Sequence, residues 1–390
     1  MKILLLGEYS NVHWTLAEGL RTLGHEVTVV SDGDRWKNYP RDIDLRRRSL
    51  STLHTLHYLW QLHRLWPRLE GYDVVQLINP VFIDLRAERI LPYYERLRRQ
   101  NGRLFLGAFG IDKPWVEEGL KPDTFRYSDF YLYGQPRLYP EAEQMRRDWL
   151  LGPKGTLYDH IAHDCDGIIS GLYEYHRCHL SHYAHKLCHI PFPIHRARVS
   201  PVQPHPEYPG IRFFIGIQRH RSRYKGTDLM LRALQRLKTL HPKAMEIVQV
   251  ENVPYARYQQ LMDTSDVLLD QLYSYTPGMN GLLAMAKGLV LVGGGEEEHY
   301  QLLGEPTLRP ILNVQPSEED VVQQIEQRLL AHPDDLRQLS LDSLTYIGRW
   351  HDHIRVAQQY LDFWRAECFA QLKVHSAEVD LCHGTMNCEL

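Results

Sequence analysis

Short apolar runs alternate with helix-like segments through the first half of the chain. Lys2–Leu6 is apolar, Trp14–Leu23 has apolar residues at helical spacing, and His25–Ser31 is rich in β-branched residues. Continuous apolar strands that alternate with helices predict βαβ units and a parallel sheet covered on both faces. The same rhythm predicts further strands at Asp73–Ile78, Arg103–Gly110, Asp166–Ser170 and His185–Pro191.

A proline-rich segment, Pro191–Gly210, interrupts this pattern and predicts a linker. A second α/β series follows it. Its predicted strands are Ile211–Ile217, Ala244–Val250, Asp266–Leu272 and Leu289–Val292, and its predicted helices are Thr227–Lys238, Asn280–Ala286, Glu318–Leu330, Asp334–Tyr346 and His353–Leu372. We therefore predict an α/β protein with an N-terminal domain over residues 1–200, a C-terminal domain over 201–350, a crossover helix over 351–372 and a mobile tail over 373–390.

The composition narrows the class of protein. Hydrophobic residues make up 43% of the 390 residues and charged residues 24%, which is typical of a soluble globular protein. The net charge of −3 carries no basic excess, so we expect no nucleic-acid partner. The apolar run Ile3–Gly7 is too short for a signal core or a membrane span, so we expect a cytoplasmic protein.

Two interpretations fit the histidine-rich stretch His176–His189, which contains Cys178 and Cys188. Thiolates and imidazoles suit zinc, but the spacing matches no standard zinc finger. We favour a histidine-rich helix followed by a strand, and we expect no metal site.

The loop Gly7–Trp14 follows the first predicted strand and lacks the Gly-x-Gly-x-x-Gly pattern of dinucleotide-binding loops. Ligands of doubly wound sheets bind beyond the C-terminal ends of the strands. We therefore expect Gly7, Glu8, Asn11 and His13 to contact the ligand. The alternatives are that Asn11 caps the following helix and that His13 is a surface residue.

The segment Gly216–Leu231 combines a strand end, a cluster of cations and a helix start. Its cations are Arg219, Arg221, Arg223 and Lys225. Arginine forms paired hydrogen bonds to phosphate oxygens and lysine supplies a point charge, so we expect a diphosphate-binding loop. The alternatives are a solvated basic loop and, less favoured because Tyr224 is its one aromatic residue, an RNA site.

A second candidate phosphate-binding stretch is "YTPGMNGLLAMAKGLVLVGGG", Tyr275–Gly295. A Pro-Gly turn opens a short helix, which ends at Lys287–Gly288 before an apolar strand. The backbone N–H groups at the start of a helix form an anion site. We expect the segment from Gly278 through Met279 and Asn280 to Gly281 to approach the ligand.

These features together resemble the retaining GT-B glycosyltransferases of the large family four. The resemblance rests on the order "strand, Gly-x-x-Arg … Lys-Gly-x-Asp, helix", on Ser265–Asp270 and on Ala284–Gly288, with the first βαβ unit also similar. It implies two Rossmann-like domains that face a cleft, with a C-terminal helix that packs back on the first domain. It also implies a nucleotide sugar bound mainly by the second domain, an acceptor on the first, and no metal or other cofactor. Arg219 and Lys225 match the basic pair that holds the diphosphate.

The chain departs from this family at two positions. The family has two glutamates around the donor loop, and their places fall at Tyr275 and Leu283. Neither residue is acidic, although Tyr275 and Asn280 carry polar groups that can contact the donor. Because cations and backbone N–H groups can stabilise the departing diphosphate, catalysis does not require the missing carboxylates.

We expect three residues to act in catalysis. Arg219 and Lys225 would hold the diphosphate, and Asp112, which follows the strand at Arg103–Gly110, would orient an acceptor hydroxyl or the donor sugar. The alternative is a loop aspartate that caps a turn. The resulting hypothesis is a retaining hexosyltransferase of polysaccharide biosynthesis that uses a UDP-linked donor and a glycan, lipid-linked or small-molecule acceptor. The alternatives are a non-catalytic nucleotide- or glycan-binding or scaffold protein and, without a matching acidic and histidine pattern, a nucleotide-sugar epimerase.

The segment Arg46–Leu69 is basic and rich in aromatic residues. Basic helices with tryptophan can rest on anionic membranes, so peripheral contact with the inner face of a membrane is one interpretation. The other, which we favour, is a helix that covers the sheet with its apolar stripe, in which Leu53, Leu56, Leu59–Trp60 and Leu62–His63 follow helical spacing.

Overall fold

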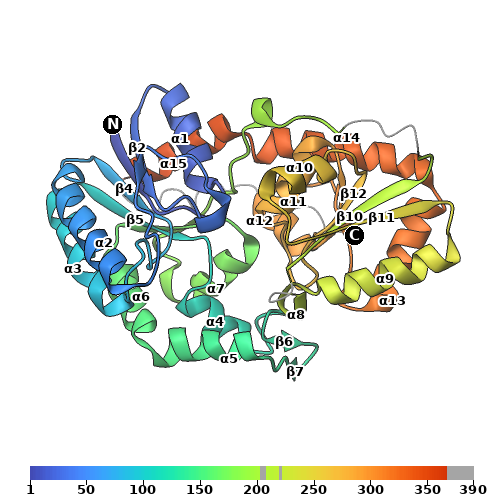
Figure 1. Cartoon of the computed structure of the whole chain (residues 1–390), viewed down its shortest axis with the longest axis horizontal. Coiled ribbons are helices and arrows are strands. Elements are labelled where there is room, and N and C mark those ends of the chain that lie inside the picture. The colour runs from blue at the N-terminus through green and yellow to red at the C-terminus, as the bar shows by residue number, and fades with distance from the viewer. Residues whose placement is uncertain (203–207, 219–221, 367–390) are drawn as a thin grey trace, which may run out of the picture.

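The computed structural model describes residues 1–202, 208–218 and 222–366. Arg219, Arg221, part of the predicted linker and the predicted tail over residues 373–390 lie outside the described residues. In the described part, the chain forms two parallel sheets that lie side by side, and a small antiparallel hairpin (Figure 1). The α/β fold expected from the alternation of apolar strands and helices is confirmed.

The first sheet has seven described strands in the order β3-β2-β1-β4-β5-β8-β9, and all neighbouring pairs are parallel. Alternate side chains of β1 enter two different cores, with Ile3 and Leu5 on one face and Leu4 and Leu6 on the other. This explains why the strand is apolar throughout. The strands are β1 (Lys2–Leu6), β2 (Glu26–Ser31), β3 (Ile43–Asp44), β4 (Val74–Leu77), β5 (Arg103–Ala108), β8 (Gly167–Ser170) and β9 (Leu187–His189). The helices are α1 (Val12–Thr22), α2 (Thr52–Leu65), α3 (Ala87–Gln100), α4 (Lys113–Gly119), α5 (Pro140–Arg146), α6 (Pro153–Asp164) and α7 (Tyr173–Tyr183), and the hairpin is β6 (Tyr131–Leu132) with β7 (Gln135–Pro136).

The second sheet has five described strands in the order β11-β10-β12-β13-β14, again all parallel. Phe213 and Ile215 of β10 face one core, whereas Phe214 between them faces the other. The strands are β10 (Ile211–Ile217), β11 (Met245–Glu251), β12 (Val267–Leu269), β13 (Val290–Gly293) and β14 (Leu312–Asn313). The helices are α8 (Ser222–Lys225), α9 (Thr227–Leu240), α10 (Tyr255–Met262), α11 (Met279–Lys287), α12 (Glu297–Leu303), α13 (Glu318–Ile325), α14 (Pro333–Trp350) and α15 (His353–Arg365).

The C-terminal helix α15 packs back on the first domain, as expected, where it lies against α1 (Figure 1). Gly19 makes this close packing feasible, because a Cβ there would lie 2.3 Å from the carbonyl oxygen of His353. At the other end of α15, Arg103 of β5 donates to the carbonyl of Trp364 at 2.6 Å. The last helix therefore ties the end of the chain to the first sheet.

One helix faces differently from the prediction. Leu53, Leu56 and Trp60 of α2 are exposed, whereas Tyr58, Leu62 and Leu65 are buried. The predicted stripe is therefore wrong at Leu53, Leu56 and Trp60 and correct at Leu62, because the face of α2 that enters the core is the one with Tyr58, Leu62 and Leu65. The histidine-rich stretch forms α7 and β9, and no three His, Cys, Asp or Glu side chains of the described residues are grouped to hold a metal ion. Within the same residues, no helix is both long enough and apolar enough to cross a membrane.

Candidate functional site

The C-terminal edges of the two sheets face each other, and the loops that follow their strands meet there. Arg126 of the first domain pairs with Glu296, at 2.8 Å, and with Glu298 of the second. Arg137, just after the β6–β7 hairpin, donates to the carbonyl of Arg223 at 2.6 Å and lies 3.4 Å from the ring centroid of Tyr273. The candidate site is therefore built from both domains, at the edge where ligands of parallel sheets bind.

A pocket of about 140 Å³ lies on the first-domain side, beyond β1, β2 and β4. Its charged lining residues are Glu8, Asp32, Asp34, Arg35 and Asp84. Asp34 is paired with Lys37 at 2.6 Å and also accepts from the Ser10 N–H. The pocket is thus mainly acidic, and its carboxylates can accept hydrogen bonds from the hydroxyl groups of a bound molecule.

Gly7 and Glu8 shape one wall of this pocket. Gly7 has a φ of +89°, and a Cβ at this position would lie 2.2 Å from Ile78 Cγ2. The Glu8 carboxylate, 2% exposed, accepts from the N–H groups of His13 at 3.2 Å and Trp14 at 2.9 Å at the start of α1. Burial raises the pKa of Glu8 to about 8. Both residues lie where the sequence predicted ligand contact, and that contact stays a prediction.

Asn11 and His13 belong to the same turn. Asn11 has a φ of +71° and donates through Nδ2 to Thr15 Oγ1 at 3.2 Å, so its side chain makes no capping bond to the helix backbone. His13 is buried rather than at the surface, and its Nδ1 lies 2.8 Å from the Gly7 carbonyl oxygen. Burial lowers the pKa of His13 to about 3, so the ring is neutral and Nδ1–H donates to Gly7.

Asp112 is the N-cap of α4 and is 1% exposed. One oxygen accepts from Trp115 N at 3.0 Å, and the other lies 3.1 Å from His179 Nε2. Burial alone would lower the pKa of His179, but the Asp112 carboxylate raises it above its usual value. The structure therefore gives Asp112 the role of a helix cap, one of the two interpretations of the sequence. An orienting role toward an acceptor would require one of these contacts to open.

Lys225 lies at the C-terminal edge of the second sheet. Its Nζ is 3.5 Å from Asp270 Oδ1, and the Lys225 side chain is 20% exposed. The Leu272 N–H donates to the Lys225 carbonyl at 2.9 Å, which joins the loop after β10 to the loop after β12. Arg223 is exposed on the same short helix, whereas Arg219 lies outside the described residues. The predicted diphosphate site therefore has at least one partly buried cation in place.

The N-terminus of α11 lies beside this lysine. Its N-cap is Gly278, and no side chain of the described residues hydrogen-bonds to the cap. A Cβ on Gly278 would lie 3.9 Å from Asp270 Oδ2, the carboxylate that pairs with Lys225. The side-chain oxygen of Asn280 accepts from Tyr258 Oη at 3.2 Å. The first-turn N–H groups from Met279 to Gly281 and the lysine are groups that can bind an anion, and Asp270 between them offsets part of the lysine charge.

Tyr275 makes interdomain contacts. Its side chain is 2% exposed and packs among Phe125, Tyr127 and Tyr173 of the first domain. Its hydroxyl accepts from the backbone N–H of Arg126 at 2.8 Å. A donor contact by this hydroxyl stays a prediction, and it would require the interdomain hydrogen bond to break.

Four further polar residues near the candidate site were not predicted from the sequence: Asp270, Arg126, Glu296 and Glu174. Asp270 had a signal, because it directly follows a predicted strand core at the ligand-binding edge. Arg126 and Glu296 meet across 170 residues of sequence, and Glu174 lies on a helix whose pattern singles out none of its polar residues. No local pattern could have revealed these three.

No family model and no curated protein sequence matches the chain. The fold is similar to that of a sucrose-phosphate synthase from Thermosynechococcus elongatus, with a TM-score of 0.59, 14% identity, and coverage of 94% of this chain and 98% of that one. It is also similar to Anabaena HepE in complex with UDP and glucose, with a TM-score of 0.58 and 12% identity. The match covers 93% of this chain and 98% of the HepE chain. The protein has the GT-B fold. A third similar structure is WaaG, a glycosyltransferase involved in lipopolysaccharide biosynthesis, with a TM-score of 0.52, 13% identity, and coverage of 94% and 100%.

Proposed function

We propose that this protein is a glycosyltransferase that moves a hexose from a nucleoside-diphosphate sugar, UDP-linked, to a glycan, lipid-linked or small-molecule acceptor with retention of configuration. The observation that carries the proposal is that Lys225 and the N-terminus of α11, which has no side-chain cap among the described residues, both lie beside Asp270 at the C-terminal edge of the second sheet. A cation and a helix N-terminus together suit the diphosphate of a leaving nucleotide. HepE, of similar fold, has been crystallised with UDP and with UDP-glucose, which supports a donor of this class.

In this proposal the second domain binds the donor and the pocket beyond β1, β2 and β4 receives the acceptor. Arg219, Arg223 and Lys225 neutralise the diphosphate, so the site works without a metal ion. Hydroxyl groups of the acceptor donate to the pocket aspartates, Asp32, Asp34 and Asp84, which are hydrogen-bond acceptors when ionised.

The experiment is a transfer and hydrolysis assay with purified protein and a panel of UDP-, GDP- and ADP-sugars. We expect slow release of UDP from a UDP-hexose, faster release with a suitable acceptor, and a product with the anomeric configuration of the donor. Absence of turnover with every donor, together with a Kd for UDP above about 1 mM, would refute the proposal.

A second candidate is a binding protein of the same fold without catalytic activity. The Tyr275 hydroxyl and the Asn280 amide oxygen, the two groups expected to replace the missing glutamates, both have protein partners. Tight UDP binding measured by calorimetry, with no hydrolysis of any donor, would favour this candidate.

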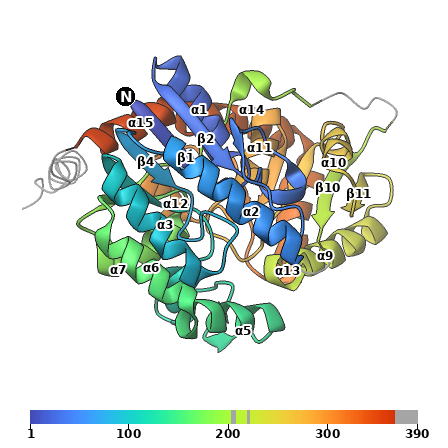
Figure 2. The same cartoon turned by 60° about the vertical axis from the view of Figure 1, so that its left-hand side comes forward.

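We also propose that the protein works at the inner, cytoplasmic face of an anionic membrane through α2. Leu53, Leu56 and Trp60 of α2 are 78%, 60% and 53% exposed, and Leu50, just before the helix, is 81% exposed, so the four form a large exposed apolar surface. Residues 46–69 contain five arginines and no acidic residue, although the whole chain has a net charge of −3. Figure 2 has this helix at the front of the molecule. An apolar stripe within a basic segment matches the interface of an anionic bilayer.

This docking would favour a lipid-linked acceptor, because Tyr58 of the same helix lines the first-domain pocket. The test is co-sedimentation with vesicles of neutral or of 30% anionic lipid, a composition of about the charge found in natural membranes. We expect binding to anionic vesicles alone and its loss in a Leu53→Ser/Trp60→Ser variant. Leu240→Ser is the control, because Leu240 is 57% exposed on the other domain. Equal binding to neutral vesicles, or no effect of the double substitution, would refute membrane docking.

A further inference from the structure

The chain from Gln271 to Gly295 contains no acidic residue, yet a carboxylate is bound to its backbone. Glu174, in the first turn of α7, reaches across from the first domain. One of its oxygens accepts from Ser274 Oγ at 2.8 Å, Tyr275 N at 2.5 Å and Thr276 N at 3.1 Å. The Tyr173 N–H adds a bond to Thr276 Oγ1 at 3.2 Å. The loop that leads into α11 is therefore held by the opposite domain.

These bonds are strong because they are buried. Glu174 is 4% exposed, and Ser274 and Tyr275 are also buried. A hydrogen bond to a charged group contributes more than a neutral one, and a buried donor without a partner destabilises its surroundings. Without the carboxylate, the Tyr275 N–H would have no other acceptor among the described residues, and the Thr276 N–H would keep only its 3.4 Å bond to Ser274 Oγ. Ser274 Oγ could still donate to the Thr276 carbonyl at 2.6 Å. The loop would then rearrange, together with the start of α11 that follows it.

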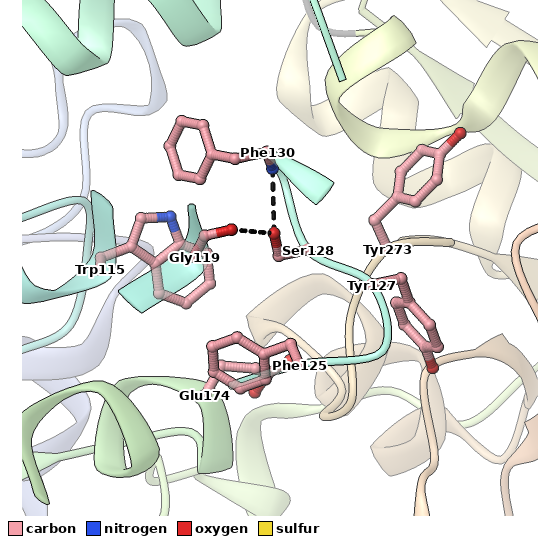
Figure 3. A pocket seen from close by; sticks show the side chains of 8 residues that line it. All are labelled: Trp115, Gly119, Phe125, Tyr127, Ser128, Phe130, Glu174 and Tyr273. Carbon is pink, nitrogen blue, oxygen red and sulfur yellow. Dashed lines mark hydrogen bonds between the residues drawn. The ribbon is translucent and has the colours of Figure 1, made fainter. Parts of the chain in front are cut away.

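The surroundings of the second oxygen of Glu174 leave no room for a sugar in this arrangement of the domains. It has no hydrogen-bond partner among the described residues and borders a cavity lined by Trp115, Phe125, Tyr127 and Tyr273 (Figure 3). The cavity volume is about 10 Å³. Such a volume suits one water molecule and is far too small for a hexose ring.

We infer that Glu174 is a positioning residue: from the first domain it fixes residues 274–276, so that the N-terminus of α11 is presented to the donor. This inference rests on the proposed function. It also couples donor binding to domain closure, since Glu174 belongs to one domain and its partners to the other. The anion site is complete only when the two domains are in contact.

The test compares Glu174→Ala with Glu174→Gln in the full chain, with Glu143→Ala as a control at an exposed glutamate of α5. Calorimetry gives the Kd for UDP, and hydrogen exchange of the ligand-free protein follows the amides of Tyr275 and Thr276. We expect Glu174→Ala to raise the Kd at least tenfold and to accelerate exchange in residues 272–281. Glu174→Gln retains an acceptor oxygen, so we expect its Kd to stay within about threefold of that of the wild type.

Two results would overturn the inference. Unchanged exchange and affinity in Glu174→Ala would mean that the loop does not depend on the carboxylate. An equal loss of affinity in Glu174→Gln and Glu174→Ala, with exchange in residues 272–281 of Glu174→Gln unchanged, would mean that the charge itself acts on the ligand. If the wild type binds no UDP, the proposed function fails, and the exchange measurement still decides the positioning role. If Glu174→Ala does not fold, Ser274→Ala and Glu174→Gln provide the same comparison.

Discussion

Replacement of Lys225 by alanine tests the diphosphate site most directly. The Lys225 side chain is 20% exposed, and its Nζ lies 3.5 Å from Asp270 Oδ1. Two unit charges about 4 Å apart interact by about 1 kcal/mol in water and about 4 kcal/mol at an effective dielectric constant of about 20. A hydrogen bond to a charged group contributes about 1.5–3 kcal/mol, which lies between these limits. Because about 1.4 kcal/mol corresponds to a tenfold change, we expect the Kd for UDP to rise about 10- to 150-fold.

Calorimetry with UDP, UMP and uridine separates this effect from a general loss of structure. The affinity for uridine should change less than about twofold, because uridine has no phosphate to contact the lysine. The UDP effect should shrink as salt is added. Lys243→Ala, at an exposed lysine of the same domain, is the control.

A double variant identifies the part played by Asp270. Lys225→Ala leaves this carboxylate, 6% exposed, without its lysine and beside the α11 N-terminus, where it would repel a diphosphate. Lys225→Ala/Asp270→Asn should therefore recover part of the lost affinity. Equal losses for UDP and uridine in Lys225→Ala, or a UDP loss below twofold, would refute the phosphate role of Lys225.

Three further predictions concern stability and metal dependence. Gly7→Ala should lower the free energy of unfolding by about 1–3 kcal/mol more than Gly24→Ala in urea titrations, because both glycines have positive φ but only Gly7 lacks room for a Cβ; equal losses would contradict this account. Burial lowers the pKa of His299 to about 3 and that of His351 to about 4, so below pH 6.5 the unfolded chain binds protons that the folded chain does not. As the pH decreases below 6.5, the free energy of unfolding should therefore decrease by about 1.4 kcal/mol per pH unit for each of the two histidines. His299→Gln should reduce the slope of this free energy against pH by about one proton. An unchanged slope would contradict the lowered pKa of His299. Sugar transfer should be unaffected by EDTA, since the proposed site uses cationic side chains and a helix N-terminus; loss of activity restored by a divalent cation would contradict a metal-free site.

The sequence by itself determined the fold and which loops are candidates for the site. β1 and β10 have the predicted bounds, because strands buried on both faces are apolar throughout and stand out from the amphipathic helices around them. The short edge strands β3 and β14, of two residues each, gave too little pattern to be predicted. The parallel arrangement then places the Gly7 loop, Lys225 and Gly278 at the ligand-binding edges of the sheets, so these candidates follow from topology.

Only the tertiary structure decided what individual polar side chains contact. Asp112 caps a helix and pairs with His179, and Glu174 binds a loop about 100 residues away in sequence. Such pairings depend on how two domains meet, which leaves no periodic signal in either segment. The same holds for α2: its pattern predicted an amphipathic helix, but packing decided that Tyr58 and Leu62 face the sheet while Trp60 faces outward. The spacing of apolar residues along a helix predicts that it has an apolar face, and the neighbouring elements determine which apolar face is buried.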